Sequence, residues 1–190
     1  MKTRSRLFIT LVIVLALAFL ADQWRRAHLE SSQDKNILAA ARKYGVEPAL
    51  IKAVIWRESR FDPHARGRKG ETGLMQIMPL TGREWAEAQR VPLFAEMVLR
   101  DPANNIDCGT WYLRKLLPRY ARTDDPIPYA LADYNAGRSN VLKWMKEEAT
   151  TNSAAFIEQI GFPSTQAYVR DVMTRRLKYA TEFDKRSAEN

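Results

Sequence analysis

The 190-residue chain is poor in the side chains that build disulfide and metal frameworks. It contains one cysteine, Cys108, and two histidines, His28 and His64. A single cysteine excludes an intramolecular disulfide and a cysteine-rich zinc site. Two histidines this far apart likewise exclude a polyhistidine metal site. We therefore expect no metal and no cofactor, which leaves carboxylate, hydroxyl or amide chemistry, or simple binding, as the open functions.

Internal repeats, low-complexity blocks and strand-like alternation are also missing. Hydrophobic residues make up 46% of the chain and charged residues 27%, a balance that can bury a core. Apolar residues recur at helical spacing in segments bounded by proline and glycine, for example 34–44 before Gly45, 48–60 starting at Pro48, and a longer segment that Asp101-Pro102 opens. These patterns predict one all-α domain with at most a small β or loop element.

The charge balance is moderately basic. Thirty Lys and Arg residues against 22 Asp and Glu give a formal net charge of +8. A positive excess suits an anionic polymer or a membrane surface but identifies neither. No basic motif is interleaved with aromatic residues, so we expect no nucleic-acid partner.

The N-terminal segment has the pattern of a targeting or anchoring element. Lys2, Arg4 and Arg6 precede an apolar run over residues 7–21, and Trp24 follows it. A cleaved signal peptide and an uncleaved signal anchor both fit, because the run is slightly short for a bilayer of about 30 Å. Either way, we expect the rest of the chain to be exported.

These observations predict a division of the chain into four parts. We expect a signal peptide or membrane anchor over residues 1–21, a linker over 22–33, the folded domain over 34–183 and a tail over 184–190.

Glu58 is the strongest candidate for chemistry. In the helix predicted over residues 48–60, Ile51, Val54, Ile55 and Glu58 share one face. Burial at the end of this apolar face would raise the pKa of the carboxyl, as a general acid working near neutrality requires. Spacing alone also allows a solvated acid at a fraying helix end, paired with a neighbouring arginine.

The motifs that follow Glu58 narrow these alternatives. They are Glu58-Ser59-Arg60-Phe61-Asp62-Pro63, Gly73-Leu74-Met75-Gln76-Ile77-Met78-Pro79, Asn105 with Gly109 and Tyr112-Leu113, Ala130-Leu131-Ala132-Asp133-Tyr134-Asn135-Ala136-Gly137, and Tyr168-Val169. In this order the set closely resembles the catalytic domain of the soluble lytic transglycosylases, relatives of goose-type lysozyme. The resemblance covers roughly residues 36–180.

The resemblance implies a lysozyme-like helical fold and a peptidoglycan substrate of alternating N-acetylglucosamine and N-acetylmuramic acid. It implies that Glu58 first protonates the glycosidic oxygen and then acts as base on the muramyl 6-hydroxyl, which gives a 1,6-anhydro product. One carboxylate then performs both proton transfers, so the usual pair of glycosidase carboxylates is unnecessary.

The resemblance also implies a set of substrate-binding residues. Gln76 and Met78 match positions that line the glycan cleft, and Tyr134 matches a tyrosine close to the catalytic acid. Asn135 follows Tyr134 in the same turn, and Glu71 is a second loop carboxylate that some members share.

Two departures from the family pattern keep other functions open. Gly67 stands where many members have a serine, and Ser164 stands where they often have a glutamate. The alternatives are a hydrolysing muramidase, or a weakly active glycan-binding or scaffold component of an envelope-spanning machine. We expect an extracytoplasmic (periplasmic) monomer that acts on peptidoglycan strands and is attached to the inner membrane through residues 7–21 if these are not cleaved.

Overall fold

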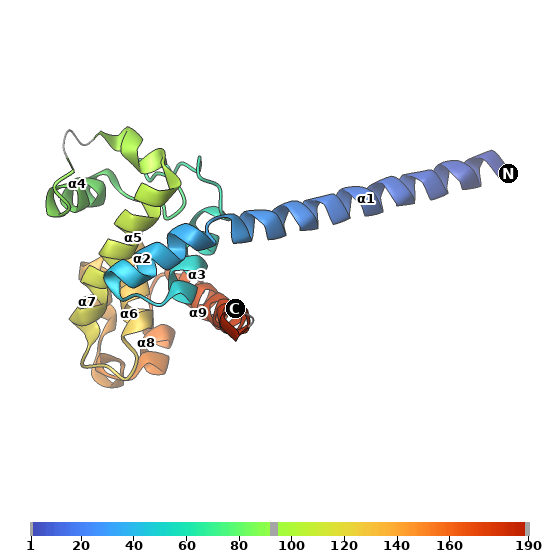
Figure 1. Cartoon of the computed structure of the whole chain (residues 1–190). Helices are drawn as coiled ribbons and strands as arrows, with labels where there is room; N and C mark the ends of the chain where they lie inside the picture. The colour runs from blue at the N-terminus through green and yellow to red at the C-terminus, as the bar shows by residue number, and fades with distance from the viewer. Residues whose placement is uncertain (1, 92–94, 189–190) are drawn as a thin grey trace.

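A computed structural model describes residues 2–91 and 95–188 of the chain (Figure 1). The described part is helical, with isolated β-bridges in one loop in place of strands. Its α-helices are α1 (Lys2–Ser32), α2 (Asp34–Tyr44), α3 (Pro48–Ser59), α4 (Pro79–Ala88), α5 (Pro102–Leu116), α6 (Pro126–Ala136), α7 (Arg138–Trp144), α8 (Ser153–Gln159) and α9 (Pro163–Ala188). Short 3₁₀ helices cover Glu96–Arg100, Leu117–Tyr120 and Glu147–Thr150. The all-α prediction is confirmed.

Proline and glycine set several helix ends where the sequence predicted them. Gly45 ends α2 in the left-handed conformation, with φ of +64°. Pro48 and Pro102 occupy the first turns of α3 and α5, where a missing backbone N–H costs nothing. The Asp101 side chain accepts a hydrogen bond from the Asn104 backbone N–H and so caps α5.

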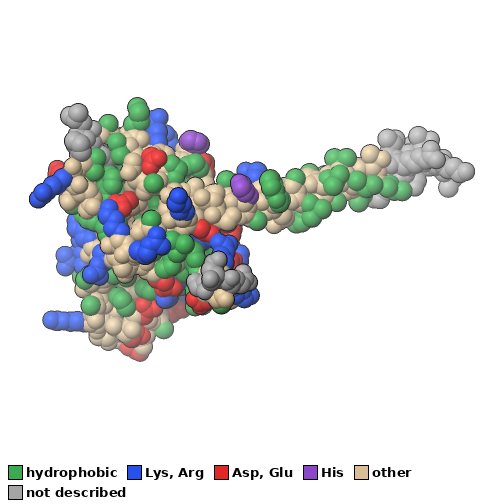
Figure 2. All heavy atoms as spheres, viewed as in Figure 1, with side chains coloured by type: hydrophobic (Ala, Val, Ile, Leu, Met, Phe, Trp, Pro, Cys, Tyr) green, Lys and Arg blue, Asp and Glu red, His purple; other side chains and the backbone are tan. Residues whose placement is uncertain are grey.

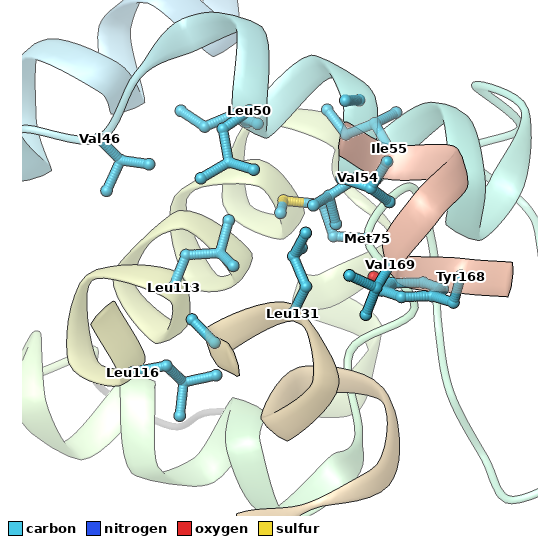
Figure 3. Close-up of a cluster of buried hydrophobic side chains, with 14 of the residues drawn as sticks. Val46, Leu50, Val54, Ile55, Met75, Leu113, Leu116, Leu131, Tyr168 and Val169 are labelled. Atoms are coloured by element: carbon cyan, nitrogen blue, oxygen red, sulfur yellow. The ribbon is translucent and has the colours of Figure 1, made fainter. Parts of the chain in front are cut away.

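The core is built around α3 (Figure 3). Every residue from Ala49 to Ile55 is buried, as expected for a helix that is apolar on nearly all faces. Helix α9 packs along α3 and supplies Tyr168, Val169 and Val172 to the same core. Burying each large aliphatic side chain contributes roughly 1.5–3 kcal/mol, so this central contact is a principal stabilising element.

One charged residue interrupts the apolar surface of α3. The Lys52 side chain is only 2% exposed, and its Nζ lies 2.6 Å from Asp34 Oδ1 at the start of α2. Arg186, near the end of α9, contacts the other Asp34 oxygen. The rings of Tyr179 and Phe183 lie 5.0 and 5.2 Å from the Lys52 ammonium. We call Asp34, Lys52 and Arg186 the ion cluster; Lys52 and Asp34 are its buried members, and it joins α2, α3 and α9.

Helix α1 projects away from the remaining helices as a single long rod (Figures 1 and 2). Its large apolar side chains between residues 9 and 20 are 47–63% exposed, namely Ile9, Leu11, Val12, Ile13, Val14, Leu15, Leu17, Phe19 and Leu20. Residues 22–33, expected to be a linker, are helical up to Ser32 and are separated from α2 only at Gln33. None of the described helical stretches has the length and apolar character needed to cross a bilayer.

Part of the N-terminal expectation cannot be compared with the structure. Met1 lies outside the described residues, as do the side chains of residues 2–8, which include the three basic residues and the first apolar ones. In the predicted tail, residues 184–188 continue α9, and residues 189 and 190 lie outside the described part.

Candidate active site

Glu58 lies in the last turn of α3, at the end of the apolar face that the sequence predicted. Ile51, Val54 and Ile55 on this face are fully buried, and Glu58 is partly buried. The Tyr168 hydroxyl on α9 donates a hydrogen bond of 2.7 Å to Glu58 Oε1. The carboxylate is therefore held by a side chain from the helix that packs against α3.

The environment of Glu58 favours its protonated form. Burial is the largest influence and raises the pKa of Glu58 from 4.5 to about 7, an effect to which the negative charge of Glu71 adds. The hydrogen bond from Tyr168 and the positive charge of Arg57 act in the opposite direction, because both stabilise the carboxylate. A carboxyl group with this pKa can both give and recover a proton near neutral pH.

The loop after α3 is fixed by side-chain hydrogen bonds to its backbone. The Ser59 hydroxyl donates to the Leu74 carbonyl oxygen at 2.8 Å. Buried Asn105 accepts from the Met75 N–H and donates to the carbonyl oxygens of Thr72 and Leu99, each at 2.8 Å. Gly73 has a φ of +78°, and a Cβ there would lie 2.3 Å from Asn105 Nδ2. Any other residue at position 73 would displace the amide that holds the loop.

Tyr134 comes to this loop from α6. Its hydroxyl donates a hydrogen bond of 2.8 Å to the Met75 carbonyl oxygen. Burial, followed by the nearby negative charge of Glu58, raises the pKa values of the Tyr134 and Tyr168 phenols well above 10. Both phenols are therefore neutral hydrogen-bonding groups beside the carboxyl group.

Gln76, Met78 and Asn135 occupy the surroundings rather than the immediate contacts of Glu58. The Gln76 amide nitrogen donates to the carbonyl oxygens of Ala65 and Gly73, which leaves its own carbonyl oxygen for a ligand. Met78 is 39% exposed at the start of α4. Asn135 is exposed and accepts a hydrogen bond of 2.8 Å from the buried Thr165 hydroxyl on α9.

Glu71 folds back over its own loop. Its Oε2 accepts a hydrogen bond of 2.8 Å from the Lys69 backbone N–H. A Cβ at Gly67 would lie 2.1 Å from Glu71 Oε2 and 2.8 Å from Glu71 Cβ. The glycine that departs from the family pattern therefore leaves the space that the Glu71 side chain fills.

In the structure, the negative charge of Glu71 acts on Glu58 and that of Glu58 acts on Tyr134, so the three side chains lie near one another. Within residues 2–91 and 95–188, no hydrogen bond joins Gln76, Met78 or Asn135 to Glu58. Tyr168 was not among the expected site residues, although it makes the one side-chain hydrogen bond to Glu58 in the described part of the chain. Its presence in the motif set was the available signal, since 110 positions separate the two residues and no local spacing connects them.

Metal-binding groups are sparse around this site. Across the described residues, no cluster of three or more His, Cys, Asp or Glu side chains could hold an ion. Cys108 is fully buried in α5, where burial raises the pKa of its thiol, so it is a packing residue.

Comparison with known proteins shows which family has a similar sequence. The family model described as "Transglycosylase SLT domain" matches residues 35–157. The chain is 32% identical over 130 residues to the soluble lytic murein transglycosylase of Escherichia coli K12, covering 67% of this chain and 20% of that protein. It is 42% identical over 125 residues to the membrane-bound lytic murein transglycosylase C of Klebsiella pneumoniae, covering 61% of this chain and 35% of that protein.

Solved structures show the same likeness in three dimensions. An inactive glutamate-to-glutamine mutant of the lytic transglycosylase Slt of Pseudomonas aeruginosa superposes with a TM-score of 0.72 at 30% identity. The match covers 79% of this chain and 24% of that one. The chain thus spans between a fifth and about a third of the length of these larger proteins, and the family match over residues 35–157 includes Glu58 and the loop after it.

Proposed function

The chain belongs to the transglycosylase SLT domain family, and from this premise we propose that it is a lytic murein transglycosylase. In this proposal, it cleaves the β-1,4 bond between N-acetylmuramic acid and N-acetylglucosamine and leaves 1,6-anhydro ends. The observation that carries the proposal is a partly buried Glu58 with a pKa of about 7, held by Tyr168 beside a fixed loop.

The first step requires an acid. Protonated Glu58 donates its proton to the glycosidic oxygen as the bond from that oxygen to the anomeric carbon breaks. Positive charge develops on the sugar ring at this stage, and in the proposal the carboxylate that Glu58 has become helps to stabilise it. The neutral Tyr168 hydroxyl stabilises the same carboxylate by its hydrogen bond.

The second step requires a base. The Glu58 carboxylate accepts the proton of the muramyl 6-hydroxyl, and the oxygen of that hydroxyl bonds to the anomeric carbon. Glu58 ends the cycle protonated, so the reaction consumes no water and needs no second carboxylate. In the proposal, Gln76, Met78, Tyr134 and Asn135 bind the glycan, and Glu71 influences the charge state of Glu58.

The relatives support this assignment through their known activity and through one inactivating mutation. They are described as lytic murein transglycosylases, and one solved structure is described as inactive after a glutamate was replaced by glutamine. The proposal includes export and action outside the cytoplasm, with the N-terminal segment serving as signal peptide or anchor. The existence of a membrane-bound relative is consistent with the role of anchor.

The mass of the released glycan tests the proposed reaction. We expect purified murein incubated with the protein to yield muropeptides whose anhydro ends are lighter by one water than hydrolysed ends. Hydrolysed products alone would replace the proposal with muramidase activity. No released product, with murein still retained by the protein, would replace it with a glycan-binding function.

The pH dependence of cleavage tests the groups that surround Glu58. Because Glu58 must start protonated, the rate at limiting substrate should fall as pH rises through about 7 in the unmodified protein. We call this fall the alkaline limb of the pH–rate profile. Tyr168→Phe removes a hydrogen bond to the carboxylate, which raises the pKa of Glu58 and moves the alkaline limb to higher pH, on the order of one unit. Glu71→Gln removes a nearby negative charge and should move it to lower pH.

The opposite signs make the two variants controls for each other. A general loss of structure would lower the rate in both without moving the limb in opposite directions. Limbs that stay in place in both variants would show that another group, not Glu58, sets the pH dependence.

A further inference from the structure

A large cavity lies where the base of α1 meets the rest of the protein. Its volume is about 1040 Å³, and we call it the junction cavity. It is bounded by the second half of α1, the end of α3 with the turn after it, and the middle of α9. The side chains that bear on its chemistry are Arg25, Glu30, Trp56, Arg60, Arg175 and Lys178.

Two arginines of the junction cavity are stacked on the same tryptophan. The guanidinium carbons of Arg60 and Arg175 lie 3.4 and 3.9 Å from the centroid of the Trp56 ring. Arg60 reaches this position from a left-handed turn at the end of α3, with φ of +54°. A stacked guanidinium is held in place by the ring while the N–H groups at its edge remain available to donate.

Neither arginine is neutralised by a carboxylate. Among the described residues, Arg60 and Arg175 have no ion-pair partner, whereas Arg57 beside them pairs with Asp171 at 3.0 Å. Burial, followed by the positive charges of Arg57 and Arg175, lowers the pKa of Arg60, and the Asp171 carboxylate acts in the opposite direction. An anion entering the cavity would relieve this repulsion.

The acids near the junction cavity already have partners. Glu30 lies 3.9 Å from Lys178 Nζ, Asp22 pairs with Arg25 at 3.1 Å, and Asp62 accepts a hydrogen bond from the His64 backbone N–H. The two stacked arginines therefore remain as two preorganised hydrogen-bond donors, each without a carboxylate partner among the described residues. Such donors match the oxygens of a phosphate group.

The surroundings of the junction cavity indicate which phosphate it takes. The exposed large aliphatic and phenyl side chains of α1 lie between Ile9 and Leu20, and Trp24, 72% exposed, follows one turn later. On α1, the lining of the cavity starts with Gln23 and Arg25, the residues on either side of this tryptophan. In proteins that bind membranes, apolar side chains contact the hydrocarbon layer, tryptophan lies at the membrane–water interface, and cations contact the lipid headgroups. The residues of α1 follow one another in this order.

We propose that the junction cavity binds the phosphate headgroup of an anionic phospholipid when the apolar part of α1 associates with a membrane. The site is separate from Glu58, because Trp56 lies two residues earlier on α3 and so on a different side of that helix. The headgroup would hold the α1 base against α3 and α9 and orient the domain at the lipid surface.

Vesicle binding by the full chain tests this site. Vesicles of phosphatidylcholine are compared with vesicles that also contain phosphatidylglycerol, and partitioning is measured by sedimentation. Arg60→Gln with Arg175→Gln should weaken binding to the anionic vesicles about 25-fold, or about fivefold for each cation. The matched control is Arg83→Gln with Arg114→Gln, which removes the same charge from exposed positions on α4 and α5.

The possible results separate the sources of binding. A larger loss in the cavity pair than in the control pair supports the site. Equal losses would overturn it, because net charge alone would then explain the attraction. Equal binding of the unmodified protein to both kinds of vesicle would also overturn it. So would full competition by soluble glycerol phosphate, since the ligand would then be a free phosphate.

Helical content, measured by circular dichroism, must stay unchanged in both pairs. If the double variant unfolds, Arg175→Gln alone serves as the test and should weaken binding about fivefold. An unchanged affinity in that folded variant would overturn the proposal.

Discussion

Glu58→Gln is expected to lower the rate of glycan cleavage by at least about 10²–10⁴-fold while leaving the fold intact. Glutamine keeps nearly the volume of glutamate, and its carbonyl oxygen can still accept the hydrogen bond from Tyr168. It can neither donate an acidic proton nor recover one, so both proposed steps fail. The measurement is the release of anhydro-muropeptides from murein by the two proteins.

The same substitution should change stability in a pH-dependent way. Because the folded-state pKa of Glu58 is raised to about 7, the unmodified domain loses stability as pH rises from about 4.5 to about 7 and the buried group ionises. Glutamine removes this loss, so the variant should be the more stable protein above pH 7, by about 3 kcal/mol at most. The two thermal midpoints should converge near pH 4.5.

Glu84→Gln is the matched control for both measurements. Glu84 lies on α4 and pairs with Lys115 at 2.6 Å, with both side chains 41% exposed. An exposed pair of this kind contributes about 0–1 kcal/mol, so activity and midpoint should stay close to those of the unmodified protein. A folded Glu58→Gln protein with near-normal cleavage would contradict the assignment and direct attention to Glu71.

Asp34→Ala is expected to destabilise the domain by about 3–5 kcal/mol. Lys52 would keep its charge in a buried position without the carboxylate that lies 2.6 Å away, and Arg186 would lose the same partner. The rings of Tyr179 and Phe183 compensate only in part, since cation–π contacts are worth about 0.5–2 kcal/mol. For a domain of this size, the thermal midpoint should fall by about 10 °C.

A second variant separates loss of the ion pair from simple loss of packing. Asp34→Ala combined with Lys52→Met removes both buried charges and keeps the volume on α3, so most of the lost stability should return. A double variant as unstable as Asp34→Ala would mean that Asp34 acts chiefly through the start of α2. Denaturant titration of both variants and of Glu84→Gln measures the difference.

Local sequence signals predicted much of the fold. The C-terminal end of α2 lies at the expected Gly45, and α3 and α5 start at the expected Pro48 and Pro102, since these residues act on the backbone within a few positions. Helix α8 was not predicted, because it has only seven residues and its cap, Asn152, stands in a polar segment. The helical character of residues 22–32 was also missed, although no proline or glycine interrupts the chain between Ala21 and Gln33.

The candidate site could be predicted only in part, for a physical reason. The position of Glu58 at the end of an apolar face follows from helical periodicity within one segment. Its hydrogen bond with Tyr168 depends on how α9 packs on α3, and that packing is decided by the whole core. The position of the Glu71 side chain, in the space that Gly67 leaves open, depends in the same way on the path of a loop, and helical periodicity does not predict that path.

The continuity of α1 sets how far the domain can reach. A flexible linker of residues 22–33 would let the domain sample a wide volume around its point of attachment. The helix instead provides a fixed arm of about 16 Å between the apolar residues and α2. With the apolar end held at a surface, the proposed reaction at Glu58 would be confined to glycan in a thin layer beside that surface. Lengthening the arm by one helical turn would move this layer outward by about 5 Å.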